Sequence, residues 1–134
     1  MKKNEIKNLD KIWSEQVKII AKDFCEVCGL SRETSRLNSC HIIGRAYRAT
    51  RWGAWLVNSK GKMYYDLCGF CGCFRDHMEY DSHGPKEELI RTKTIGVDRY
   101  NRIRAYADEH TINDLEFEEV KSWIISVKNR NDYK

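Results

Sequence analysis

Two short cysteine pairs constrain the fold of this chain more than any other feature of its sequence. Cys25 and Cys28 are separated by two residues in FCEVCGL, and Cys68 and Cys71 have the same spacing in LCGFCGC. This gap lets both thiolates of a tight turn reach one ion, and two such turns complete the tetrahedron that zinc prefers in structural sites. We therefore expect these four cysteines to hold a structural Zn²⁺. Four buried free cysteines and a redox-active pair are the alternatives.

The composition favours a metal ion over disulfide bonds. The chain has 134 residues, of which 33% are charged, and its mean hydropathy of -0.70 leaves little apolar surface to bury. It contains no run of about 18 apolar residues, and MKKNEIKNLDKIW lacks the apolar core of a secretory signal. We expect a cytoplasmic protein with no membrane partner, in which the thiols stay reduced and a metal ion supplies part of the folding free energy.

Cys40 and Cys73 lie outside the two pairs. Each fits the role of a small buried residue, which is the usual one for a lone free cysteine. Because both are close to the pairs in the sequence, substitution of one of them into the ligand set is the alternative.

Hydrophobic periodicity predicts helices at both ends of the chain. Apolar residues recur at steps of three and four before the cysteines and again after Pro85, which suits the first turn of a helix. Asn113 and Glu116 have the spacing of a capping box for a further helix. We expect one α+β domain, 1–134, with an N-terminal helix, a cysteine-rich centre and a helical C-terminal part at residues 8–23, 24–83 and 85–130.

The segment NSCHIIGRAYRATRW, residues 38–52, contains a histidine and three arginines but no acidic residue. A histidine near its normal pKa can accept a proton from water at pH 7, and a divalent ion beside it can stabilise the charge that develops on a phosphate. His41 is therefore the candidate general base. Arginines bind phosphates, and aromatic side chains stack on unpaired bases, so we expect a DNA-binding surface made by Arg45, Arg48, Arg51 and Trp52. A solvated basic patch with aromatics in the core is the alternative.

Several segments together resemble the HNH (ββα-metal, treble-clef) endonucleases, and most of all the phage recombination proteins of the NinG type. They are CEVCG, CHIIGRAYRATRW, Asn58 and LCGFC. The resemblance covers roughly residues 8 to 110 and implies a small zinc-stabilised ββα-metal centre. It implies His41 as the base that activates water and Asn58 as the residue that orients the histidine-bearing loop. It also implies that Arg45 and Arg51 contact phosphates or the scissile group.

The sequence departs from the HNH pattern at the position of the catalytic ion. HNH enzymes usually have Asn or His directly after the last zinc cysteine as a ligand for Mg²⁺ or a similar ion, and here Gly72 follows Cys71. The segment CFRDHMEYDSH supplies other candidate ligands. His77 is our first choice and Asp76 our second for binding Mg²⁺ or Mn²⁺, and the segment also contains Asp81 and His83. A polar surface helix is the alternative.

Two functions follow from these expectations. The first is an HNH-type metal-dependent DNA endonuclease; the resemblance implies that it acts on recombination or branched DNA intermediates of a phage, in the host-cell cytoplasm. The second is a catalytically degenerate HNH-like zinc module that binds nucleic acid or a host protein without cutting. The histidine and the arginines favour the first function, and Gly72 favours the second.

Overall fold

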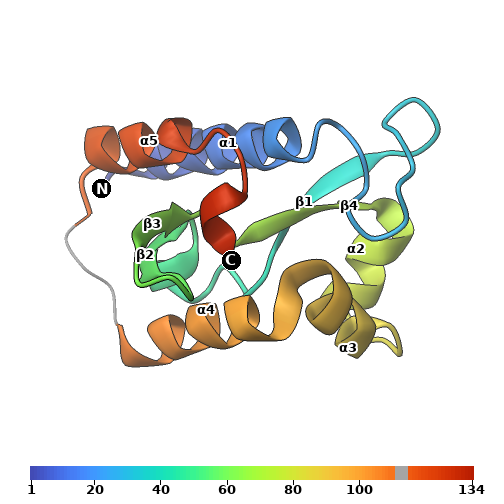
Figure 1. Ribbon diagram of the computed structural model, residues 1–134. Coiled ribbons are helices and arrows are strands. Elements are labelled where there is room, and N and C mark those ends of the chain that lie inside the picture. The colour runs from blue at the N-terminus through green and yellow to red at the C-terminus, as the bar shows by residue number, and fades with distance from the viewer. Residues whose placement is uncertain (111–114) are drawn as a thin grey trace.

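The computed structural model describes residues 1–110 and 115–134, and it shows an α+β fold, as predicted (Figure 1). The predicted N-cap Asn113 lies outside the described residues. In chain order the elements are α1 (Lys3–Ile20), β1 (Leu37–His41), η1 (Arg48–Thr50), β2 (Ala54–Val57), β3 (Met63–Asp66), β4 (Gly69–Cys73), α2 (Phe74–Asp81), α3 (Glu87–Leu89), the π-helical η2 (Ile90–Gly96), α4 (Val97–Glu109), α5 (Phe117–Ser126) and η3 (Asn131–Tyr133).

The strands form two small antiparallel sheets. β2 and β3 form a hairpin. β1 pairs with β4, and this hairpin lies between them in the sequence. The register of β1 with β4 places His41 opposite Gly69 and Leu37 opposite Cys73. Figure 1 shows α1 and α5 side by side on one side of the strands, and α4 on the other.

Helix α1 packs on the strands because its apolar residues repeat every four positions. Leu9, Trp13 and Val17 are all buried. Residues 18–20, which follow Val17, are half-buried or exposed. The helix begins earlier than predicted because Glu5 accepts a hydrogen bond from the Lys2 amide at 2.8 Å, which caps the first turn. It ends earlier because Lys22 and Asp23 adopt left-handed backbone angles.

A buried ion pair connects α4 to the end of β3. The guanidinium of Arg99 donates two hydrogen bonds of 2.8 Å to the carboxylate of Asp66 and lies 4.2 Å from the ring centre of Tyr133. The carboxylate also accepts bonds from the Cys68 amide at 2.8 Å and from the Tyr64 hydroxyl at 3.1 Å. All the bonding capacity of this buried carboxylate is therefore used, and α4 is held against the strands.

Among the described residues, no helix has the length and apolar character needed to cross a bilayer.

We predict that Asp66→Ala lowers the free energy of unfolding by about 3–5 kcal/mol, because it leaves the charge of Arg99 buried without a partner. Chemical denaturation followed by far-UV circular dichroism measures the change. The matched control is Asp108→Ala, which removes the partner of Arg104 in an exposed pair and should leave stability close to that of the unmodified protein. Equal effects of the two substitutions would contradict the role given to the buried pair.

Candidate functional site

The first part of the site is a tight turn that follows α1. Phe24 and Ser31 form an isolated antiparallel bridge, and the amide of Cys25 donates to the carbonyl of Leu30 at 2.8 Å. Gly29 closes the turn with a φ of +82°, a conformation that a glycine adopts without strain. The amide of Cys28 points at the sulfur of Cys25 at 3.4 Å. The turn therefore presents both sulfurs on one side, as the spacing of the pair predicts.

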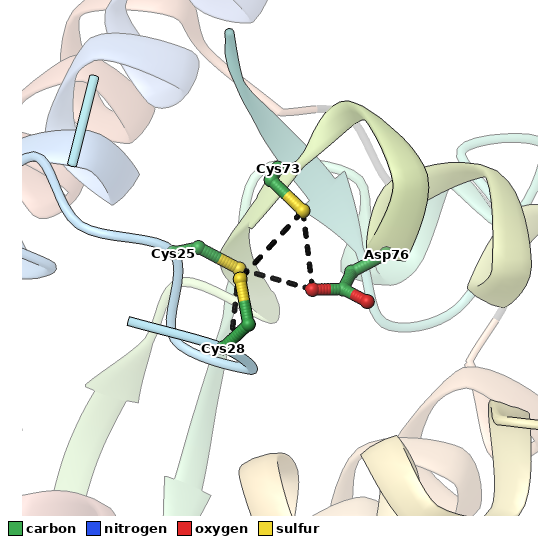
Figure 2. A group of neighbouring side chains, drawn as sticks. All are labelled: Cys25, Cys28, Cys73 and Asp76. Atoms are coloured by element: carbon green, nitrogen blue, oxygen red, sulfur yellow. Dashed lines mark hydrogen bonds between the residues drawn. The ribbon is translucent and has the colours of Figure 1, made fainter. Parts of the chain in front are cut away.

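Cys73 and Asp76 face this turn from the junction of β4 and α2. Cys73 is the last residue of β4 and Asp76 lies in the first turn of α2, and both side chains are buried. Figure 2 shows the three sulfurs and the carboxylate converging on one point. The carboxylate oxygen of Asp76 accepts bonds from the thiols of Cys73 at 3.1 Å and Cys25 at 3.3 Å, and the sulfurs of Cys28 and Cys73 are 3.8 Å apart.

These four residues form a group that could hold a metal ion. One potential ligand atom from each of Cys25, Cys28, Cys73 and Asp76 lies within 4.8 Å of the others. Four ligands at the zinc–sulfur distance of about 2.3 Å form a tetrahedron with edges of about 3.8 Å. The hydrogen-bonded pairs, at 3.1 to 3.8 Å, are close to that size, so the cluster is a candidate four-ligand site with a different set of ligands from the predicted one.

The structure does not bring Cys68 and Cys71 into the group. Cys68 is completely buried beside the carboxylate of Asp66, and its own amide donates to that carboxylate. Cys71 lies in the middle of β4, where its amide donates to Glu26 at 2.5 Å. The alternative in which Cys73 enters the ligand set agrees with this geometry. Two residues separate Cys73 from Asp76, as in the two cysteine pairs, and this spacing is the signal in the sequence for Asp76.

Cys40, the other unassigned cysteine, lies in the core. It has no exposed surface, and a side chain at Gly72 would come within 3.3 Å of its sulfur. Gly72 therefore gives Cys40 room in the β1–β4 pair, and burial raises the pKa of the Cys40 thiol.

The ionisation of the cluster depends on its hydrogen bonds. Burial opposes the charge on Asp76, but the thiols of Cys73, Cys25 and Cys28 outweigh it and hold the pKa of this carboxyl below its usual value. Burial raises the pKa of Cys73 to about 12. Thiols must lose their protons to bind a metal, so binding of a cation at the cluster would release protons.

The second part of the site is a cleft of about 760 Å³ that β1, α2 and α4 border. It contains three of the four histidines of the chain, together with acidic, aromatic and basic side chains. Such a mixture in one concave site is what general acid–base and metal-assisted chemistry requires. Its ionisable lining residues are His41, Arg45, Tyr47, His77, Tyr80, Asp81, His83, Glu87, Tyr100 and Arg104.

His41 lies at the end of β1 and contributes its ring to the cleft wall. The ring stacks on Trp13 with a centroid distance of 4.1 Å and an interplanar angle of 13°. Burial lowers the pKa of His41 to about 4; the negative charge of Asp10 opposes this shift, and the positive charges of Arg51 and Arg45 add to it. His41 is therefore neutral at pH 7, and its lowered pKa makes it a weaker base than the histidine of normal pKa that the sequence predicts.

His77 and Asp76 are neighbours in sequence but point to different parts of the site. Successive residues of a helix are about 100° apart, so Asp76 faces the cysteines whereas His77 faces the cleft. This separates the two predicted ligands of a catalytic ion. The partner of His77 is Asp81, one helical turn later, with the ring nitrogen Nε2 2.7 Å from a carboxylate oxygen. His83 and Glu87 form a second such pair at the cleft.

Two of the four predicted DNA-binding residues have structural contacts instead. Arg51 donates to both carboxylate oxygens of Asp10 on α1, at 3.0 and 2.7 Å. The indole of Trp52 donates to the same carboxylate at 2.8 Å, and its ring is only 2% exposed. A buried ring cannot stack on a base. Arg45 is exposed at the cleft, and Arg48 is half-buried at a neighbouring hollow, so these two remain available for phosphate.

Asn58 closes the β2–β3 hairpin. Its side-chain oxygen accepts hydrogen bonds from the backbone amides of Lys60 and Lys62, each at 3.0 Å. Its side-chain nitrogen donates to the backbone carbonyl of Asp132 at 3.0 Å. Within the part of the chain that the structure describes, these contacts join the hairpin to η3. This differs from the expected role of orienting the loop that carries the histidine.

We predict that His41 makes the protein less stable as the pH falls. Its folded pKa of about 4 is below the ordinary value of 6.5, so the unfolded chain binds the proton first between these pH values and stability is lost there. The loss through this group reaches at most about 3 kcal/mol at low pH. Denaturation of the unmodified protein and His41→Phe, a ring that can still stack on Trp13, should give curves that diverge below pH 6.5. Parallel curves, as expected for the exposed control His110→Phe, would contradict this assignment.

Comparison with known proteins adds no family to these observations. No protein-family model, curated protein or solved structure matches the chain. The function must therefore be inferred from the chemistry of the cluster and the cleft.

Proposed function

We propose that this protein is an HNH-type metal-dependent DNA endonuclease with a structural zinc ion. The zinc ligands are Cys25, Cys28, Cys73 and Asp76, and the zinc-bound turn, β1, β4 and α2 form the treble-clef-like ββα-metal centre. The catalytic cleft is the one that contains His41 and His77. Hydrolysis of a phosphodiester bond is the reaction that a neutral histidine, a bound divalent ion and nearby arginines perform together.

One observation carries this proposal: His77 directly follows Asp76. HNH enzymes usually have Asn or His directly after the last zinc cysteine, where it binds the catalytic ion. Gly72 follows Cys71 and Phe74 follows Cys73, and neither side chain can bind an ion. The next ligand of the cluster, Asp76, is followed by His77, which lines the same cleft as His41. A candidate ion ligand therefore follows the zinc cluster, three residues later than the HNH pattern places it.

The residues of the cleft have roles that fit this reaction. His41 accepts a proton from the attacking water, because burial keeps its ring neutral. His77 and Asp81 bind a Mg²⁺ or Mn²⁺ ion, which keeps several water or phosphate ligands because Mg²⁺ is usually bound through few protein side chains. Arg45 binds the substrate phosphate at the exposed edge of the cleft.

A second candidate function is a module that binds DNA, or a host protein, without cutting. It is favoured by the distribution of ligands: among residues 1–110 and 115–134, the cysteine cluster is the one group of three or more metal-binding side chains with converging ligand atoms. A catalytic ion would therefore start from the pair His77 and Asp81 alone. The cleavage assay below separates the two functions.

We predict that the protein purifies with one zinc ion per chain and that Cys73→Ser removes it, because the ion loses one of four ligands. Elemental analysis by mass spectrometry measures the zinc. The matched control is Cys71→Ser, which changes a buried cysteine of the same strand and should retain the ion. Zinc loss in the control and retention in Cys73→Ser would instead support the ligand set read from the sequence.

We predict that the zinc-loaded protein nicks supercoiled plasmid DNA in the presence of Mg²⁺ or Mn²⁺. His41→Ala should lower the rate by about 100-fold or more, the usual contribution of a general base, and His77→Ala should raise the Mn²⁺ concentration needed for cleavage. Gel electrophoresis measures both effects.

His110→Ala is the control for cleavage, since this exposed histidine lies outside the cleft. The control should cut at the normal rate, and all variants should keep their zinc. DNA binding without any cutting by the unmodified protein would refute the endonuclease and support the binding module. Undiminished cutting by His41→Ala would refute the assignment of the base.

A further inference from the structure

Trp13 of α1 lies flat against the proposed general base. Its ring is parallel to that of His41 within 13°, at a centroid distance of 4.1 Å, and is only 2% exposed. One face of the imidazole is therefore covered by a side chain that belongs to a different element from His41 itself.

The indole of Trp13 has little freedom to move. Its Nε1 donates a 2.7 Å hydrogen bond to the carbonyl of Leu67. Gly69, which pairs with His41 in the β1–β4 register, leaves the space that the indole occupies: a Cβ atom at this position would lie 2.4 Å from Cζ2 of Trp13. The hydrogen bond and the missing side chain together fix the plane of the indole, and the stack transfers that plane to His41.

The His41 ring has an orientation in which one of its nitrogens lacks a hydrogen bond. Its Nε2 is fully buried and has no hydrogen-bond partner among the described residues. A buried polar atom without a partner costs about 1–3 kcal/mol, so a free ring would turn to satisfy it. Burial lowers the pKa of His41, whereas the charge of Asp10 and the backbone of Arg51 raise it; Asp10, one turn before Trp13, also binds the guanidinium of Arg51. Because Nε2 is buried, Nδ1 is the nitrogen left to face the cleft.

We propose that Trp13 is a positioning residue that fixes the His41 ring in one orientation, with Nε2 buried and Nδ1 toward the cleft, and thereby holds the ring in a single neutral tautomer. This inference rests on the proposed function for the use of the ring as a base. The arrangement itself is a property of the folded protein. It can be measured without any substrate.

The test is ¹⁵N NMR spectroscopy of the histidine rings at pH 7, where nitrogen shifts distinguish the two neutral tautomers. The unmodified protein should show His41 as a single tautomer. Trp13→Phe keeps a flat ring but loses the bond to Leu67, and should largely retain this tautomer. Trp13→Leu removes the stack and should give a mixture of tautomers, with the pKa of His41 moving back toward its ordinary value.

Val17→Ala is the matched control for damage to α1. It removes buried volume from the same helix face without touching His41, so it should lower stability but leave the tautomer unchanged. In the cleavage assay, Trp13→Leu should reduce kcat by about 100-fold with little change in KM, as expected for a misplaced catalytic group, whereas Val17→Ala should retain kcat.

The outcomes separate this inference from the proposed function. A mixture of tautomers in the unmodified protein, or an unchanged single tautomer in folded Trp13→Leu, would overturn the positioning role even if the protein cuts DNA. If Trp13→Leu does not fold, a mixed tautomer in folded Trp13→Phe would overturn it instead. Absence of cleavage in every variant would refute the endonuclease, while the NMR result would still decide the role of Trp13.

Discussion

The direct passage from β4 into α2 is the constraint on which both parts of the site depend. Cys73 ends the strand and Phe74 begins the helix with no connecting loop, so the pairing of β4 with β1 also fixes the position of the first turn of α2. That turn sends Asp76 to the cysteines and His77 to the cleft. A cation bound at the cluster would therefore stabilise the same backbone that presents His77.

Polar contacts hold α1 and α4 against the elements around this junction. Asp10 connects α1 to the segment after β1 through two donors, Arg51 and Trp52. The buried pair of Asp66 and Arg99 connects α4 to the end of β3. Each pair satisfies its hydrogen-bonding groups almost completely, which is what buried charges require. Helix α4, which borders the cleft, and helix α1 are thus fixed by specific contacts in addition to apolar packing.

Local patterns in the sequence identified the features that depend on neighbouring residues. The apolar repeat of α1 and the turn that presents Cys25 and Cys28 were both predictable, because helix periodicity and a two-residue gap act over a few positions. The second half of the cluster was not predictable. Cys68 and Cys71 are separated by two residues, and so are Cys73 and Asp76, so only the folded arrangement of β4 and α2 selects between these two pairs.

The same limit applies to residues whose partners are distant in the sequence. Arg51 and Trp52 resemble a DNA-binding run when read with their neighbours, but their partner Asp10 lies 41 and 42 positions away. Asn58 likewise fits a family position, although its amide bonds to a carbonyl 74 residues later. Residue type and neighbouring residues suggested a functional role at all three positions, and the long-range contacts give each of them a structural partner.

The hairpin between the paired strands has a consequence for how this protein can change. Residues 42–68 connect His41 to Gly69, and the exposed tip of the β2–β3 hairpin at Lys60 and Gly61 is part of that connection. The entropy lost on closing a flexible loop grows only with the logarithm of its length, so doubling this connection adds about 0.6 kcal/mol. New segments can therefore enter at the tip at small thermodynamic cost, and they would extend the molecule while the geometry of the paired strands is preserved.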